Sequence, residues 1–363
     1  MSYGLGDAID LGSIRRALVV KLRHHGDVLL SAPVFSVLKN RAPHAEIDAL
    51  VYEDTRPMLE GHPAIAEVHT IGRGWRELPA TAKLAAEWRL FATLRERRYD
   101  LLVALTEHNR GAWLARTLGV RWSIAPAYSG RSRFWKRSFT HRFELPKNPR
   151  RHAVERNLDA LRRLGIQPAP EERRVVLVPG AEAEAAIDRH LAEAGLAAKG
   201  FVHVHPASRW LFKAWPAERF AALADRLHDA GHRVVLTAAP SEPELALVRE
   251  IRSRTRADVV DLAGALSLKE LAALAARARL FVGVDSAPMH IAAAMGTPTV
   301  AIFGPSGDTE WGPWMVRHRV VASDRHPCRP CGIDGCGGGK VSDCLATLPL
   351  EAVWDAAQSL LAE

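Results

Sequence analysis

The sequence predicts an α/β protein built from two Rossmann-like halves, each with a parallel sheet. Short runs of Val, Ile and Leu alternate with longer amphipathic stretches, as in βαβ units. The 363 residues suit about two domains, and the segment Gln167–Glu172, with two prolines and two acids, is typical of a linker. We therefore expect domains over residues 1–170 and 171–348, followed by a helix over 349–363 that could pack on either domain.

In the first half, apolar runs bounded by loops predict three strands, and amphipathic stretches predict two helices. The strands are Ala17–Leu22, Glu46–Tyr52 and Asp100–Leu105, and the helices are Val28–Asn40 and Ala82–Arg98. Because Pro33 lies inside the first helix and lacks an N–H group, we expect a kink or an irregular opening turn there.

The second half has the same strand and helix rhythm. Its strands are expected at Arg174–Val178, Gly200–His205, Arg233–Thr237, Val259–Asp261, Leu280–Val284 and Pro298–Phe303. Its helices are expected at Ala183–Ala194, Pro216–Ala230, Glu242–Arg254, Leu268–Arg277, Pro288–Met295 and Leu350–Ala362. This alternation predicts a second parallel sheet covered by helices.

Composition narrows the class of protein. Hydrophobic residues are 48% and charged residues 25% of the chain, which is typical of a soluble globular protein. No apolar run of 18 residues occurs, and the first residues carry acids and glycines where a signal peptide needs a cationic start and an apolar stretch. We therefore expect a cytoplasmic location.

The net charge of +8 is unevenly distributed. Residues 1–165 hold 28 Lys and Arg against 17 Asp and Glu, a net +11, while the rest holds 21 against 24, a net −3. Arg131–Arg163 alone contains 11 basic and 3 acidic residues. This segment is either a solvated basic face or a surface that meets an anionic macromolecule, a membrane or a phosphorylated acceptor.

Ligands of open α/β sheets bind at the carboxyl ends of the strands, so the loops that leave strands are the candidate sites. In the loop Lys21–Pro33, Asp27 lies at the start of the expected helix, beside His24 and His25. Asp27 is either an ordinary helix N-cap or a general base whose pKa the two histidines shape. The histidines are candidates for contacting the substrate.

A second loop opens the helix near Pro288. Ser286 can cap that helix, and Pro288 suits its first turn. Exposed N–H groups and the helix dipole form a site for phosphate there. His290, one turn further on, is either a donor to a phosphate oxygen or a satisfied core histidine.

Two more loops of the second half complete the candidate site. Lys213 supplies a point charge suited to a diphosphate, or else a surface cation–π pair with its aromatic neighbours. Ser208 lies in the same loop, and Glu242 and Glu244 follow the next strand. These carboxylates either bind a ribose diol or interact favourably with a helix dipole. Together the loops suit a nucleoside diphosphate.

Alternative nucleotide motifs are missing. No GxGxxG fingerprint occurs, and Gly335–Lys340 lacks Walker spacing and is followed by Val341 in place of Ser or Thr. Four cysteines stand at Cys328, Cys331, Cys336 and Cys344. They are expected to be reduced structural thiols, with a tetrahedral zinc site as the alternative, because only the first pair has CxxC spacing.

Three stretches carry a family resemblance that covers nearly the whole chain: LVVKLRHHGDVLLSAPVFSVLKN, VHPASRWLFKAWP and VGVDSAPMHIAAAMGTPTVAIFGPSG. They resemble the lipopolysaccharide heptosyltransferases, inverting glycosyltransferases of the GT-B fold. The stretches KLRHHGDVLL and CRPCGIDGCGGGKVSDCL are most similar to the branch that adds the third heptose of the inner core, heptosyltransferase III.

The resemblance implies two Rossmann-like domains facing across a cleft, an N-terminal one for the acceptor and a C-terminal one for ADP-heptose. Asp27 matches the family's catalytic base, Lys213 its diphosphate-binding lysine, and Glu242 its nucleoside-binding glutamate, with Glu244 near enough to leave the register open. The family also has an element Asp-[Thr/Ser]-Gly-x-x-His around the diphosphate and heptose. The residues that match it here are Asp285, Ser286, Ala287 and His290, with alanine in place of the common glycine.

The implied reaction transfers L-glycero-D-manno-heptose from ADP-heptose to a heptose of the lipopolysaccharide inner core. It needs no cofactor, and the implied partners are the lipid-borne acceptor and an anionic membrane surface at the cytoplasmic face of the inner membrane, without nucleic acid. Heptosyltransferase I or II, or another ADP-heptose-dependent transferase, remains an alternative.

Two remote alternatives belong to other classes. Gly283–Ala287 approaches the nucleophile elbow of an α/β-hydrolase, with Asp285 as nucleophile, although Ala287 breaks the pattern. The basic charge alone would also allow a nucleic-acid-binding protein, but aromatic residues are only 7% and no recognised binding motif is present.

Overall fold

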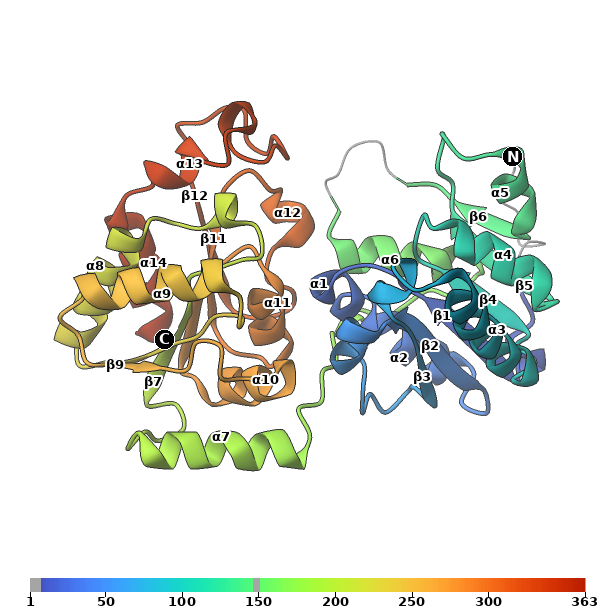
Figure 1. Ribbon diagram of the computed structural model, residues 1–363, viewed down its shortest axis with the longest axis horizontal. Coiled ribbons are helices and arrows are strands. Elements are labelled where there is room, and N and C mark those ends of the chain that lie inside the picture. Colours follow the sequence, from blue (N-terminus) through green and yellow to red (C-terminus); the bar gives the residue numbers. More distant parts are fainter. Residues whose placement is uncertain (1–7, 146–150, 363) are drawn as a thin grey trace. The chain divides into compact units, whose positions relative to one another are not determined.

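The protein is described by a computed structural model that covers residues 8–145 and 151–362 (Figure 1). It divides into two compact units, Met1–Leu177 and Val178–Glu363. The division lies after Leu177, against an expected boundary after residue 170. Among the described residues, no helix combines the length and the apolar character needed to cross a membrane.

The first unit contains a six-stranded parallel sheet in the order β3-β2-β1-β4-β5-β6. Its strands are β1 Arg16–Val20, β2 Glu46–Tyr52, β3 Glu67–Ile71, β4 Leu101–Ala104, β5 Trp122–Pro126 and β6 His141–Phe143. Its helices are α1 His25–Leu29, α2 Ala32–Arg41, α3 Ala80–Glu96, α4 Asn109–Thr117, α5 Arg133–Ser138 and α6 Ala153–Arg163. Helix α2 packs against α6, and α4 packs against α5.

The second unit contains another six-stranded parallel sheet, in the order β12-β11-β10-β7-β8-β9. Its strands are β7 Phe201–His205, β8 Arg233–Leu236, β9 Val259–Asp261, β10 Leu280–Val284, β11 Thr299–Phe303 and β12 His318–Ala322. Its helices are α7 Ala181–Glu193, α8 Ala217–Asp229, α9 Glu242–Arg254, α10 Leu268–Arg277, α11 Ala287–Ala294, α12 Asp308–Trp311, α13 Asp343–Ala346 and α14 Leu350–Leu361.

Both faces of the second sheet are buried, because successive side chains of a strand point to opposite faces. In β10, Val282 packs into a core that also holds residues of α8, α9 and α14, whereas its neighbour Phe281 packs into a separate core with residues of α10 and α11. The C-terminal helix α14 therefore packs on the second unit, and the Trp215 indole N–H donates to the Leu348 carbonyl at 3.1 Å just before it.

The expected helix Val28–Asn40 is two helices, α1 and α2. The break falls at Leu30 and Ser31, where the Ser31 hydroxyl donates to the Val28 carbonyl at 2.6 Å. Pro33 then occupies the first turn of α2, the position where its missing N–H is tolerated. The irregular opening predicted from Pro33 is confirmed.

Strand prediction was wrong at one place and incomplete at others. Arg174–Val178 forms no strand: Val175 and Leu177 are buried, but the segment joins neither sheet, because its apolar alternation reflects packing of an extended connection. Four strands were not predicted, because they are short or mix polar with apolar residues; three of them lie at a sheet edge and the fourth lies next to one. They are β3, β5, β6 and β12.

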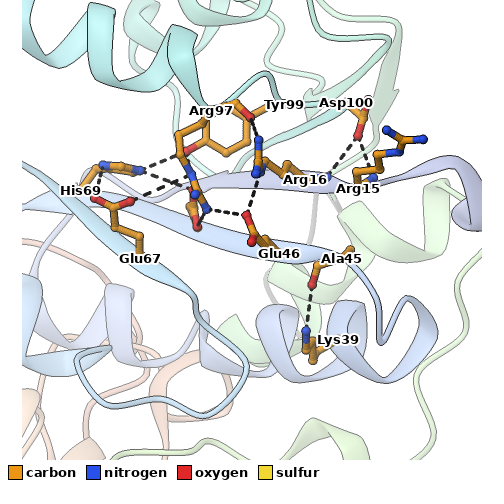
Figure 2. A network of polar contacts seen from close by, with 11 residues as sticks. Arg15, Arg16, Lys39, Ala45, Glu46, Glu67, His69, Arg97, Tyr99 and Asp100 are labelled. Carbon is orange, nitrogen blue, oxygen red and sulfur yellow. Dashed lines mark hydrogen bonds and ion pairs between the residues drawn. The ribbon is translucent and has the colours of Figure 1, made fainter.

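A buried ion-pair network closes the amino end of the first sheet (Figure 2). The fully buried Asp48 accepts from Arg97 at 2.8 and 3.0 Å and from the Tyr99 hydroxyl at 2.6 Å, and the His69 ring lies 3.5 Å away. Burial alone would raise the Asp48 carboxyl pKa, but these donors outweigh it and lower that pKa. The network ties β2 and β3 to the turn before β4, at the edge opposite the candidate site.

Side-chain atoms of Asp48, Glu67 and His69 lie within 4.8 Å of one another, a spacing that metal ligands can have. The Arg97 guanidinium already occupies both Asp48 oxygens, and it lies 4.0 Å from Glu67 as well. A fixed cation there opposes a second one. This group is therefore an ion-pair network that supports the fold.

Candidate active site

The predicted site residues lie at the carboxyl edges of the two sheets and form one group in each unit. In the first unit, Asp27 and its two neighbouring histidines follow β1. In the second, the loops after β7, β8 and β10 carry the others. Parallel pairing brings these loops to one edge although they are far apart in sequence.

Asp27 is the third residue of α1, and His24 occupies the N-cap position. The alternative of Asp27 as an ordinary N-cap is therefore wrong. Its side chain is 18% exposed, and its Oδ1 lies 3.8 Å from Nε of Arg23. The His25 ring Nε2 lies 3.0 Å from the Asp54 carbonyl oxygen. Asp27 is thus accessible to a substrate and has a cation beside it.

Lys21 is a buried cation close to Asp27 that the sequence analysis did not single out. Its Nζ donates to the Leu105 carbonyl at 3.2 Å and to Asn157 Oδ1 at 3.1 Å. Burial lowers its pKa to about 8, and the Asp27 carboxylate partly offsets that effect. The one sign of it in the sequence is its position, since it is a charged residue inside the otherwise apolar run Ala17–Leu22.

A polar pocket of about 650 Å³ adjoins this edge, lined by Glu87, Glu107, His108, Asn109, Arg110, Trp113 and Arg131. Glu107 accepts from Arg23 at 2.8 Å and from the Tyr128 hydroxyl at 3.4 Å. Burial, with the nearby Glu107 charge, raises the pKa of Tyr128 to about 12, so that this phenol stays protonated. Through Arg23, the pocket is connected to Asp27.

In the second unit, the structure brings two predicted residues into direct contact. Nζ of Lys213 donates to Oδ2 of Asp285 at 2.6 Å, and both side chains are largely buried. Nζ of Lys213 also lies 5.2 Å from the centre of the Trp210 ring, so that the cation–π contact and the charged role coexist. The ion pair holds the Lys213 ammonium group at the amino end of α11.

Ser286 is the N-cap residue of α11, but its hydroxyl donates back to the Val284 carbonyl at 3.1 Å and makes no side-chain cap. Ala287 and Pro288 form the first turn, and His290 is buried. The Ser286 side chain therefore does not cap the N–H groups at the amino end of α11, where the helix dipole places partial positive charge. Ser208, in the β7 loop, is buried and bonds the Trp210 backbone.

The two glutamates that the sequence left in doubt have different environments. The Glu244 side chain is buried, and its Oε2 accepts from the Ala239 N–H at 3.1 Å, which closes the loop after β8. The Glu242 side chain is 75% exposed and pairs with Arg249. Glu242 is thus the one accessible to a ligand.

The Thr237 hydroxyl connects the end of β8 to two histidines of β7. Oγ1 of Thr237 lies 2.7 Å from Nε2 of His203 and 2.8 Å from Nδ1 of His205, on the neighbouring strand β7. One hydroxyl proton serves only one ring, so at least one ring donates to Thr237. Burial lowers the pKa of both histidines to about 3, which keeps them neutral. The sequence analysis assigned these residues no role.

The hydrolase alternative is wrong. A nucleophile elbow strains the backbone at the nucleophile, yet Asp285 is not among the described residues with positive φ, and its carboxylate is held by Lys213. Gly283 serves packing instead, because a Cβ there would lie 2.9 Å from the His205 carbonyl oxygen on β7.

The four cysteines do not form a ready metal site. Cys344 is buried and the other three are exposed, and no three of the four Sγ atoms lie within 4.8 Å of one another. Burial raises the pKa of the Cys344 thiol, with the other thiols contributing in the same direction. The zinc alternative gains no support from this geometry.

Residues 87–341 match the family described as Glycosyltransferase family 9 (heptosyltransferase). The chain belongs to this family. It is 39% identical over 295 residues to lipopolysaccharide heptosyltransferase 3 of Escherichia coli, an alignment that covers 81% of this chain and 84% of the relative. The predicted family is confirmed, and the chain is a glycosyltransferase.

Two solved structures are similar to this family 9 chain. The glycosyl transferase family 9 protein from Veillonella parvula DSM 2008 has a TM-score of 0.83 at 23% identity and covers 98% of this chain and 99% of its own. E. coli heptosyltransferase WaaC with ADP-2-deoxy-2-fluoro heptose has a TM-score of 0.72 at 21% identity, covering 95% and 99%. The predicted GT-B fold is confirmed.

The buried histidines give the second unit a specific sensitivity to acid. Their pKa of about 3 lies below the unfolded value of ~6.5. As the pH falls below that value, the unfolded chain binds protons first, so stability is lost between pH ~6.5 and ~3, at ~1.4 kcal/mol per pH unit for each histidine. In urea unfolding from pH 7 to 5, we expect His203→Gln to lose about 2 kcal/mol less in total than wild type, because the loss begins only near pH ~6.5.

His228→Gln is the matched control, because His228 is exposed on α8 and should leave the wild-type slope unchanged. Equal slopes for His203→Gln and wild type would contradict the neutral, buried state of these rings.

Proposed function

We propose that this family 9 glycosyltransferase transfers L-glycero-D-manno-heptose from ADP-heptose to a heptose of the lipopolysaccharide inner core, with inversion, as the enzyme that adds the third heptose. The observation that carries the donor assignment is the Lys213 ammonium, held by Asp285 at the amino end of α11. The identity to a heptosyltransferase 3 supports the choice of branch.

The second unit binds the donor in this proposal. Lys213 and the N–H groups at the start of α11 stabilise the negative charge that grows on ADP as it leaves, because fixed donors aimed at a developing charge lower the barrier most. His290 and Ser208 border this site, and Ala287 replaces the family's glycine beside the diphosphate. We assign the nucleoside contact to Glu242, since the Glu244 carboxylate already closes its own loop.

The first unit binds the acceptor, with Asp27 as general base. Its carboxylate removes the proton of the attacking hydroxyl while that oxygen forms the new bond to the anomeric carbon, and the bond to the diphosphate breaks on the opposite face. His24 and His25 flank it as acceptor contacts. The Arg23 Nε lies 3.8 Å from that carboxylate.

The surroundings of the reaction follow from these ligands. We propose that the enzyme works in the cytoplasm, peripherally at the cytoplasmic face of the inner membrane of a Gram-negative cell, because a nucleotide sugar is soluble and the acceptor is lipid-borne. Transfer needs no cofactor and no nucleic-acid partner. A zinc ion on the cysteines would be structural, and metal analysis of the purified protein tests for it.

Defined truncated cores test the proposed function. Incubated with ADP-heptose, the enzyme should add one heptose to a core that already carries two, and mass and linkage analysis should identify the product. Transfer to a heptose-free core would overturn the branch assignment, and no transfer from ADP-heptose to any core would overturn the function.

Asp27→Asn should lower kcat by about 10²- to 10⁴-fold, because general base catalysis contributes that much. ADP binding and thermal unfolding should stay at wild-type values, since the side chain is partly exposed and bonds no core group. Glu60→Gln, an exposed carboxylate of the same unit paired with Arg56, serves as control and should keep full activity. Wild-type turnover by Asp27→Asn would remove the base assignment.

Lys213→Ala should raise the Kd for ADP by roughly 10- to 100-fold in a calorimetric titration, because charged hydrogen bonds contribute about 1.5–3 kcal/mol. The loss includes repulsion between the diphosphate and the unpaired Asp285. The double variant Lys213→Ala/Asp285→Asn should therefore recover part of the affinity. An unchanged Kd in the single variant would refute the diphosphate role.

A further inference from the structure

Helices α3, α4 and α5 of the first unit expose large apolar side chains next to one another. Leu84 and Trp88 are 71% and 64% exposed on α3, and Trp113 is 58% exposed on α4. Trp113 also stacks on Phe134 of α5, with ring centres 4.8 Å apart. Exposed residues of this size in one patch mark an interaction site more often than isolated ones do.

The apolar residues line a groove between α3 and α4 with a volume of about 300 Å³. Its lining is Leu84, Glu87, Trp88, Leu90, Phe91, Leu94, Arg110, Trp113, Leu114 and Thr117. Helix α3 buries little of its surface, since Leu94 is its one fully buried residue among those the structure describes. The groove is therefore an open apolar surface along a largely uncovered helix.

Positive charge predominates on these three helices. Together the three helices carry eight Lys and Arg but only Glu87 and Glu96 as acids. Glu87 is neutralised by a two-bond contact with Arg110 at 2.5 and 2.6 Å, and Arg116 lies 5.2 Å from the centre of the Phe134 ring. An apolar patch of Trp, Leu and Phe with a basic rim is the pattern of an interfacial, membrane-associating surface.

The same surface continues into the polar pocket beside Asp27. Glu87, Arg110 and Trp113 line both the groove and the pocket. The pocket then reaches Glu107, which Arg23 connects to the catalytic edge. A lipid-borne acceptor has an apolar anchor and a polar sugar chain, and this surface offers an apolar region and a polar one in the same order.

We propose that α3, α4 and α5 form a docking surface for an anionic lipid bilayer. Trp88, Leu84 and Trp113 enter the interface, the Lys and Arg side chains meet lipid phosphates, and the polar pocket is held at head-group level for the acceptor sugars. Tryptophan suits this position because its ring is apolar while its N–H remains near water. The acceptor part of this inference rests on the proposed function, whereas the bilayer contact does not.

Vesicle binding tests the docking surface without any reaction. Wild-type protein should co-sediment with vesicles of phosphatidylcholine and phosphatidylglycerol, and less with phosphatidylcholine alone or at high salt. The double variant Leu84→Gln/Trp88→Gln should lower the partition coefficient at least about tenfold, because two large apolar side chains leave the interface. Both residues are exposed, so folding should survive, as thermal unfolding will check.

The matched control is Ile333→Gln/Val341→Gln, which removes two exposed apolar side chains from the second unit and should bind vesicles like wild type. Equal binding by the Leu84→Gln/Trp88→Gln variant and wild type would overturn the proposal. So would wild-type protein that ignores anionic vesicles but retards RNA in a mobility-shift assay, or that forms dimers through this face.

Activity separates this inference from the proposed function. On a deacylated, water-soluble core acceptor, the Leu84→Gln/Trp88→Gln variant should keep wild-type kcat/KM, because neither residue lines the polar pocket. On the acceptor embedded in vesicles, it should lose about tenfold or more. An equal loss on both acceptors would show that the residues act in catalysis and would overturn the docking role. If wild type transfers to neither acceptor while vesicle binding behaves as expected, the proposed function fails and the docking surface stands.

Discussion

Short parallel strands buried on both faces are the constraint on which this molecule depends. Strand β10 is apolar at every position except Gly283, and each face packs into a different core. Charged groups cannot lie within such a sheet without partners, so they gather at its two ends. At the amino end of the first sheet, Asp48 is buried only because Arg97 and Tyr99 satisfy it. The carboxyl ends are left for ligands.

At both carboxyl edges, each acid placed in the reaction has a cation beside it. Arg23 lies next to Asp27 in the first unit, and Lys213 bonds Asp285 in the second. In the proposed mechanism the two pairs serve different purposes: in the first, the carboxylate is the base, whereas in the second, the acid positions a cation for the diphosphate. Because each pair is within one unit, each site can be organised before its ligand arrives.

The sequence was sufficient to predict which loops carry the candidate site residues, but not which side chains those residues contact. Strand periodicity and the turn residues located Asp27, Lys213 and Asp285 correctly, because the carboxyl ends of parallel strands follow from the βα rhythm. The Lys213–Asp285 bond spans 72 positions, and only the pairing of β7 with β10 brings it about. Lys21 was overlooked for the same reason: its partners come from other elements, and burial, which gives it an unusual pKa, has no local signal.

The uneven charge of the chain takes on a more specific meaning in the structure. Two arginines near the end of the basic segment Arg131–Arg163 pair with acids of the same segment, because Arg151 and Arg162 both bond Asp159, and Arg162 also pairs with Glu155. The cations of α3, α4 and α5 have few acids among them and surround exposed aromatic rings instead. A count of charges along the sequence therefore does not locate the proposed bilayer surface. That surface lies where acids are few and large apolar side chains are exposed, and most of it precedes the basic segment in the sequence.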